Sequence, residues 1–139
     1  MNSAEARAVF RHGVQHRALN FDGLDLTSAV AVTGRGLSFD RCSFDGADFR
    51  QATLERVHFK MCTGATFRGA FLRNTSFGGC DLRGVDLRDA DLSGASFGYV
   101  NTGRDDIGRT DVTGADFAGA NLDGVELARV VGWPFPLKD

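Results

Sequence analysis

Large apolar side chains recur at every fifth position through most of this chain. The central run has no gap and consists of Phe67, Leu72, Phe77, Leu82, Leu87, Leu92 and Phe97. The same phase continues in steps of five from residue 102 to residue 127 and includes Phe117, Leu122 and Leu127. An upstream run in a shifted phase contains Phe39, Phe44, Phe49, Leu54 and Phe59. Because self-similarity at a short fixed period is typical of solenoids, we predict that these positions line the interior of a repetitive coil.

A period of five matches neither regular secondary structure, because a helix returns to one face about every 3.6 residues and a strand about every two. Each unit must therefore contain a turn. A small residue stands two positions before most of the large ones, as at Ala90 and Ala115, and a polar residue such as Asp91 or Asp116 stands between them. Alternation along an extended segment then points the large and small side chains inward and the polar one outward. Such units bury their apolar side only when successive coils stack, about 4.8 Å apart, through backbone hydrogen bonds.

Three segments resemble the motif of the pentapeptide-repeat family, Ala-(Asp/Asn)-Leu-X-X: ADLSG at 90–94, ADFAG at 115–119 and ANLDG at 120–124. The resemblance covers residues 19–129. It implies an all-β solenoid, a right-handed quadrilateral β-helix with four repeats in each coil and about five coils. Residues 1–18 are then expected to form an N-terminal helical cap, and residues 130–139 a C-terminal cap or dimerisation tail.

Two steps between interior residues are eight instead of five: Ala31 to Phe39, and Phe59 to Phe67. We interpret each as a normal step plus a three-residue insertion, near residues 34–36 and 62–64. Glycines in both segments allow the backbone conformation of a bulge or tight loop.

Four repeats in each coil predict which residues stack on one another. Positions 20 apart should be neighbours, or 23 apart across an insertion, which places Phe67 beside Phe44 and Leu82 beside Phe59. On this map Asp105 takes an inward position, where an unpaired carboxylate costs several kcal/mol. We therefore expect the chain at 102–106 to loop outward, or Asp105 to pair with a nearby arginine.

The N-terminal segment has the features of a helical cap. Asn2 stands three residues before Glu5, the spacing of a capping box, and predicts a helix over residues 2–17. His12 and His16 are four residues apart, as metal ligands on a helix can be, but no third ligand follows. We interpret them as solvated side chains.

The C-terminal segment is apolar and ends in prolines. It contains Trp133 and Phe135, residue types that often anchor interfaces. This tail either folds over the last coil or mates with a second copy of the chain, in which case Trp133 and Phe135 are the dimerisation residues.

One polar cluster is predicted beside the second irregularity. The stacking map brings His58 and Lys60 next to Asp81 and Arg83. A histidine–carboxylate pair with two cations could serve as a general base with an anion clamp, so His58, Asp81 and the nearby Cys62 are the weak catalytic candidates. The alternative is an ordinary solvated face of a rod.

Two arginines and the remaining cysteines complete the candidate set. Arg68 and Arg88 stack on the next face with Asp86 nearby, and they either extend into solvent or hold an anion. Lys60 and Arg83, on the face of His58, are the other candidate binding residues. Cys42 and Cys80 occupy small inward positions and should be buried. Cys62 lies in the predicted insertion, where exposure would leave its thiol accessible.

Composition excludes several classes of function. The formal net charge of -2 gives no global basic field for nucleic acid or an anionic membrane. No apolar run is long enough to span a bilayer and no signal peptide is visible, so we expect a cytoplasmic protein. Three scattered cysteines suit neither a disulfide framework nor a zinc site, and no nucleotide motif is present, so we expect no metal and no cofactor.

Two hypotheses of function follow. The first is a non-catalytic interaction protein that presents its rod surface to a macromolecular partner. The family resemblance implies a version in which the rod imitates DNA, binds DNA gyrase or another topoisomerase, and gives antibiotic resistance or self-immunity. The net charge and the arginines Arg68, Arg73, Arg83 and Arg88 depart from a DNA mimic. The alternative is a small enzyme or ligand-binding protein that uses the cluster at His58.

Overall fold

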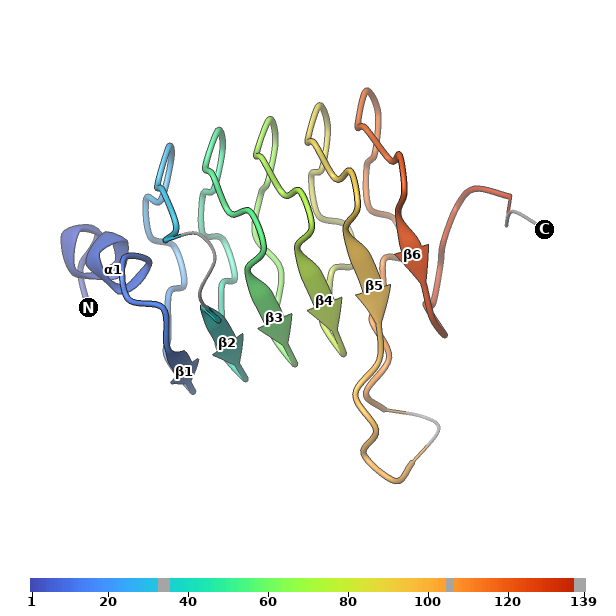
Figure 1. Cartoon of the computed structure of the whole chain (residues 1–139), viewed down its shortest axis with the longest axis horizontal. Coiled ribbons are helices and arrows are strands. Elements are labelled where there is room, and N and C mark those ends of the chain that lie inside the picture. The colour runs from blue at the N-terminus through green and yellow to red at the C-terminus, as the bar shows by residue number, and fades with distance from the viewer. Residues whose placement is uncertain (33–35, 105–106, 137–139) are drawn as a thin grey trace.

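The computed structural model describes residues 1–32, 36–104 and 107–136. The protein is a parallel β-solenoid with one short N-terminal helix, as predicted (Figure 1). Within the described ranges, six strands lie in chain order in one parallel sheet. The elements are α1 (Ser3–Val9), β1 (Gln15–Arg17), β2 (Ser38–Asp40), β3 (His58–Lys60), β4 (Ser76–Gly78), β5 (Ser96–Gly98) and β6 (Glu126–Leu127).

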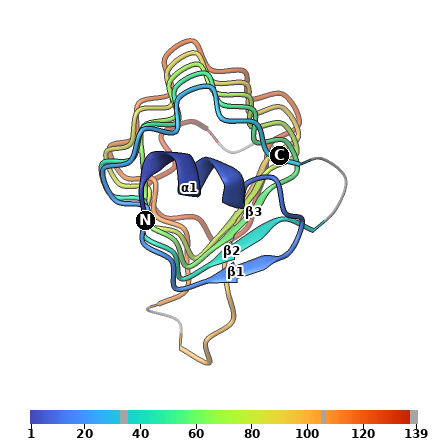
Figure 2. The ribbon, with the colours of Figure 1, turned by 90° about the vertical axis from the view of Figure 1, so that its left-hand side faces the viewer.

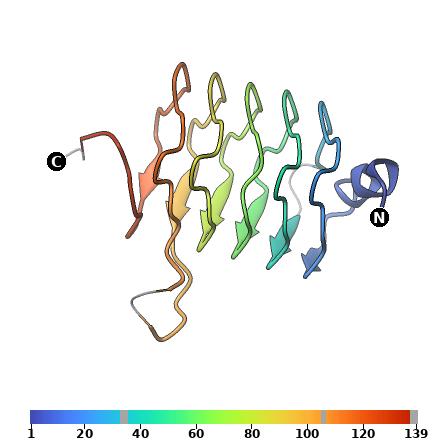
Figure 3. The same ribbon diagram turned by 180° about the vertical axis from the view of Figure 1, so that it is seen from behind.

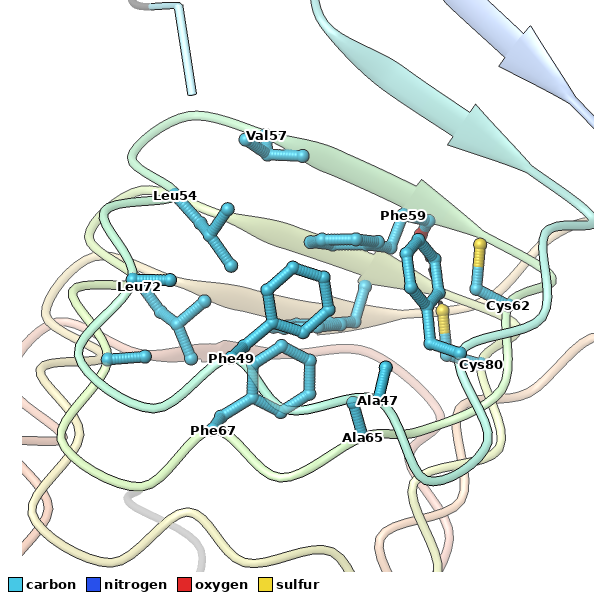
Figure 4. Close-up of a cluster of buried hydrophobic side chains, with 14 of the residues drawn as sticks. Ala47, Phe49, Leu54, Val57, Phe59, Cys62, Ala65, Phe67, Leu72 and Cys80 are labelled. Carbon is cyan, nitrogen blue, oxygen red and sulfur yellow. Dashed lines mark hydrogen bonds between the residues drawn. The ribbon is translucent and has the colours of Figure 1, made fainter. Parts of the chain in front are cut away.

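The large residue of each repeat points into the coil. Phe39, Phe59, Phe77 and Phe97 form one column, with successive ring centroids 5.6, 5.3 and 5.2 Å apart. Thirteen of the predicted interior residues are at most 6% exposed: Phe39, Phe44, Phe49, Leu54, Phe59, Phe67, Leu72, Phe77, Leu82, Leu87, Leu92, Phe97 and Phe117. Leu122 and Leu127 in the last coil are half-buried. Figure 4 shows several of these side chains directed toward one another inside the solenoid.

Where the polar residue before a large one is Asp or Asn, it has a local structural role at the corner. The side-chain oxygens of Asp86, Asp116 and Asn121 each accept the backbone N–H two residues further on, at 3.0 Å. Asp and Asn favour such turns because the short side chain imitates a backbone carbonyl. The outward polar position therefore shapes the corner as well as facing water.

The first irregular step is a true insertion. Gln15 pairs with Ser38 and Asn20 with Ser43, whereas a coil of four plain repeats would pair them with positions 35 and 40. This register confirms three additional residues in the first coil. Their predicted place near residues 34–36 falls largely on residues 33–35, which lie outside the described part of the chain.

The second irregular step is not an insertion, so that prediction was wrong. Thr63 pairs with Asp81, whereas a full coil would pair it with Arg83, so this coil is two residues short. Residues 62–64 form a repeat without its two turn residues, and Gly64 occupies the position of the large side chain. Phe67 consequently stacks on Phe49, with ring centroids 5.3 Å apart, and not on Phe44 as predicted. A step of eight is equally compatible with three residues gained or two lost.

A third irregularity keeps the sequence phase, and the outward loop expected at 102–106 is only part of it. Between β5 and β6 the chain leaves the coil as a hairpin, in which Tyr99 pairs antiparallel with Arg109 (Figures 1 and 3). Ser96 therefore pairs with Glu126, whereas a plain coil would pair it with Asp116. Residue 102 and the exposed Ile107, both predicted to lie in the interior, belong to this hairpin. Residues 102–104 of the predicted outward loop also lie in the hairpin, whereas Asp105 lies outside the described residues. The solenoid has about four turns, slightly fewer than the predicted five, since two repeat lengths lie in the hairpin.

The N-terminal helix covers the first coil, as Figure 2 shows along the solenoid axis. The capping box of Asn2 and Glu5 is present, but α1 ends at Val9 and the chain then forms β1, so the helix is much shorter than the predicted 2–17. Phe10 is fully buried, with its ring 4.9 Å from that of Phe39. This side chain closes the apolar interior at the N-terminal end.

The C-terminal tail lies against the opposite end. The backbone N–H of Val131 donates to the carbonyl of Thr110 at 2.9 Å, which begins a further partial coil. Trp133 then packs against Phe97 and Phe117, with centroid distances of 5.7 and 5.2 Å. Phe135 contacts Trp133 and is 41% exposed. The tail therefore covers the last coil only in part.

Candidate functional site

The predicted polar cluster is divided between two sides of the solenoid. His58 lies on β3, where its Nδ1 is 2.6 Å from the hydroxyl of Ser76. Asp81 lies one side further along the coil, and its carboxylate accepts two hydrogen bonds from the guanidinium of Arg83, both at 2.8 Å. Across the described ranges, no hydrogen bond or ion pair joins His58 to Asp81. The expected adjacency was wrong because the shortened coil shifts Asp81 onto Thr63.

The cations of that cluster do not converge either. Lys60 is in register with Asp40, which is 4% exposed and pairs with Arg17 and Arg41 at 3.3 and 2.9 Å. The hydrogen bond and charge of Arg83 hold the pKa of Asp81 below its usual range. Asp81 is thus a paired carboxylate and not a general base. The enzyme hypothesis therefore loses the geometry on which it was based.

Cys62 is buried, contrary to the expectation of an exposed thiol. It is 3% exposed, and its Sγ lies 3.3 Å from the carbonyl oxygen of Phe39. Hydrogen bonding with Cys42 lowers its pKa, but hydrogen bonding with Cys80 and burial outweigh this and raise the pKa of Cys62 to about 12. The three cysteines form one interior column, in which hydrogen bonding with Cys62 and burial also raise the pKa of Cys42. A thiol in this setting is a small core residue.

The arginines do stack in successive coils. The N–H of Gln51 donates to the carbonyl of Arg68 at 3.2 Å, and the N–H of Gly69 donates to that of Arg88 at 2.9 Å, which places Arg50, Arg68 and Arg88 at one corner. Arg88 is bound to Asp86 at 2.9 Å, and this hydrogen bond and charge lower the pKa of Asp86. Arg50 is likewise bound to Asp48, at 2.7 Å. These two pairs neutralise much of the row, so it does not form a concentrated anion site.

Rows of carboxylates on the C-terminal coils are the feature that the stacking map missed. Asp81 is in register with Asp111, and Asp86 with Asp116, because the hairpin lies between the members of each pair. The map had placed residues 101 and 106 at these positions, since a hairpin of two repeat lengths leaves no gap in the period. Residues 110–128 contain four acidic residues and no lysine or arginine: Asp111, Asp116, Asp123 and Glu126. The last coil is therefore acidic, although the chain as a whole is nearly neutral.

An apolar groove of about 790 Å³ opens beside this acidic coil, at the C-terminal end. Its lining includes the half-buried Leu122, Val125 and Leu127 together with Trp133 and Phe135. Among the described residues, no group of three or more metal-binding side chains lies close together, and no helix has the length and apolar character needed to cross a bilayer. The acidic coil and the adjoining groove are the strongest candidate interface.

Comparison with known proteins agrees with this architecture. The family model described as pentapeptide repeats matches eight copies over residues 35–60 and 62–98. None of the curated protein sequences compared with the chain gives a match.

Solved structures give the clearest likeness. Full-length QnrB1, a plasmid-mediated fluoroquinolone resistance protein, superposes with a TM-score of 0.62 and 26% identity, over 78% of this chain and 48% of that one. A trypsin-treated form of QnrB1 superposes with a TM-score of 0.69 and 24% sequence identity, over 84% of this chain and 54% of that one. Rfr23, a pentapeptide repeat protein from the cyanobacterium Cyanothece 51142, superposes with a TM-score of 0.71 and 13% sequence identity, over 86% of this chain and 88% of that one. The chain thus spans about half the length of the QnrB1 chains.

Proposed function

Because this chain belongs to the pentapeptide-repeat family, we propose that it is a non-catalytic interaction protein that binds DNA gyrase or another topoisomerase and protects it from quinolones or a self-made poison. Its likeness to QnrB1, a fluoroquinolone resistance protein, supports this proposal. Regular polar faces over a continuous apolar core suit a surface that presents side chains to a partner.

The observation that carries the proposal is the acidic last coil. A DNA mimic must present negative charge where the phosphates of a duplex would lie. The carboxylates of Asp111, Asp116, Asp123 and Glu126 occupy successive sides of one coil, and residues 110–128 contain no lysine or arginine. Arg88 of the preceding coil lies 3.8 Å from the carboxylate of Asp116 and compensates part of this charge. The arginine rows lie on the preceding coils and would flank the contact.

Dimerisation through the C-terminal end forms part of the same proposal. A second copy seated on the groove at Trp133 and Phe135 would cover their exposed apolar surface. It would also bring two acidic coils together and so lengthen the acidic surface. Like charges across such a contact repel, and this predicts a dimer that strengthens as salt rises.

A supercoiling assay with purified gyrase, with and without a quinolone, tests the proposal. We expect micromolar protein to inhibit supercoiling or to restore it in the presence of the drug. A variant with Asp116→Asn and Glu126→Gln should lose about tenfold in potency, because steering by charge weakens while the amide at 116 still caps its corner. Asp45→Asn, an exposed carboxylate on an early coil, is the matched control. The proposal is wrong if micromolar protein has no effect on gyrase. It is also wrong if the Asp116→Asn, Glu126→Gln variant is as potent as the Asp45→Asn control.

The dimer is tested separately by sedimentation. Phe135→Asp should shift the protein to the monomer without unfolding it, since Phe135 is already 41% exposed. A wild-type protein that remains monomeric at high concentration and high salt would remove dimerisation from the proposal.

A further inference from the structure

A trough of about 390 Å³ crosses the outer face of the sheet, from β1 to the base of the hairpin (Figure 1). Its lining includes Gln15 of β1, Ser38 of β2, His58 of β3, Ser76 of β4 and Tyr99 of the hairpin. Adjacent strands lie about 4.8 Å apart, so the trough runs about 19 Å across the strands. The volume is small for that length, and the trough therefore suits an extended chain better than a compact ligand. No part of the topoisomerase proposal depends on this face.

The base of the hairpin forms a fixed wall at one end of the trough. A Cβ at Gly78 would stand 3.5 Å from Cγ2 of Val100, so Val100 packs directly over the bare backbone of β4. Thr110, where the chain returns to the coil, is fully buried. Its hydroxyl donates to the carbonyl of Phe77 at 3.0 Å and accepts from the N–H of Cys80 at 3.2 Å. These contacts hold the wall against the sheet.

The floor of the trough is a row of polar side chains. Ser38, His58 and Ser76 are in register on successive strands, and Nδ1 of His58 is 2.6 Å from the hydroxyl of Ser76. Hydroxyl and imidazole groups include both donors and acceptors of hydrogen bonds. A peptide backbone also carries one donor and one acceptor at most residues. A peptide that lies across the strands can therefore pair with this row.

A second row gives the same face an excess of positive charge. Arg17, Asp40 and Lys60 are in register on β1, β2 and β3. Asp40 is buried and bound by both Arg17 and Arg41. Lys60 is exposed, and no carboxylate of the described residues lies within ion-pair distance of it. Glu126, on the last strand of the sheet, lines a separate hollow on the far side of Tyr99. Three cations thus face the trough against one buried carboxylate.

We propose that this trough binds an extended acidic segment of a partner protein. Carboxylates of the segment would pair with Lys60 and with the exposed edges of the two arginines, and an apolar residue would lie against Val100 and Tyr99. A single-stranded nucleic acid, the other extended anion, binds through a series of aromatic side chains on which its bases stack. Among the described residues that line the trough, only Tyr99 presents an exposed ring. The lining therefore favours a peptide.

Fluorescence anisotropy of a labelled peptide with the full chain tests the proposal. The probe has five glutamates and a C-terminal leucine amide, and its six residues span about 20 Å when extended. We expect saturable binding that weakens as salt rises, and none by the same peptide with glutamines in place of the glutamates. The proposed dimer strengthens with salt, so the two proposals respond in opposite directions and can fail separately.

Two variants with the same net charge locate the site. Lys60→Gln should weaken binding of the acidic peptide about tenfold, because it removes one charge-assisted hydrogen bond. Arg68→Gln is the matched control, since Arg68 is also exposed but lies at a corner on another side of the solenoid, and its loss should leave binding unchanged. The proposal is wrong if the acidic peptide shows no saturable binding, or if the two variants weaken binding equally. Tighter binding of a single-stranded oligonucleotide with the same number of charges would also overturn it.

Discussion

Replacing Gly64 with alanine tests whether residues 62–64 form the shortened repeat, because the substitution adds one methyl group inside the solenoid. Gly64 takes the interior position of a repeat that has lost its turn, and a Cβ there would stand 2.4 Å from Cγ1 of Val85 and 3.1 Å from the carbonyl oxygen of Asp81. Both contacts are closer than ordinary van der Waals packing, so the side chain of Val85 or the backbone of the neighbouring coil must shift. Overpacking of this kind costs about 1–3 kcal/mol. At this chain length, each kcal/mol lowers the melting temperature by about 3–4 °C.

The matched control is Gly98→Ala in β5, where nothing lies within 4 Å of the new Cβ. Alanine should be neutral or slightly stabilising there, because it reduces the entropy of the unfolded chain. Urea unfolding followed by circular dichroism gives both free energies. If residues 62–64 were an exposed loop, Gly64→Ala would be as harmless as the control. A Gly64→Ala protein as stable as the wild type would therefore refute the register.

Three further outcomes follow from burial and charge. Phe59→Ala should lose about 3–5 kcal/mol in urea unfolding, since Phe59 is 3% exposed, whereas Phe71→Ala at 47% exposure should stay within about 0.5 kcal/mol; similar losses would contradict the core assignment. The thiol of Cys62 should resist a disulfide reagent at pH 8 until the protein is unfolded, and rapid native-state labelling would show that the column opens. The hydrogen bond with Arg88 lowers the pKa of Asp86, so the charged carboxylate stabilises the fold above the unfolded pKa, and this stabilisation is lost as pH falls through the folded pKa. Asp86→Asn should therefore lower the free energy of unfolding by up to about 1 kcal/mol at pH 7. The difference between the variant and the wild type in urea unfolding should vanish near pH 2.

The sequence was sufficient to predict the solenoid because one physical constraint acts in every repeat. The large side chain must point inward and the polar one must close the corner, so burial of residues such as Leu82 and Phe97 could be read from spacing alone. The capping box at Asn2 was equally local. The end of the helix could not be predicted from local sequence, because β1 pairs with β2, which comes a whole coil later in the chain.

The candidate site could not be predicted, because it depends on register between coils. A step of eight fits both a gained and a lost segment, and only packing around Gly64 decides between them. That choice moved Asp81 away from His58. A hairpin of two repeat lengths then left the periodicity intact while changing every later neighbour, which hid the pairing of Asp86 with Asp116.

The length of the hairpin makes it a separable module. Removing residues 99–108 would join Gly98 directly to Arg109 and restore an ordinary five-residue step from Phe97 to Val112. The solenoid can therefore gain or lose this hairpin without any change in the path of the chain through the coils. The sequence of the hairpin can therefore change over evolution while the coils beneath it continue to supply the folding energy.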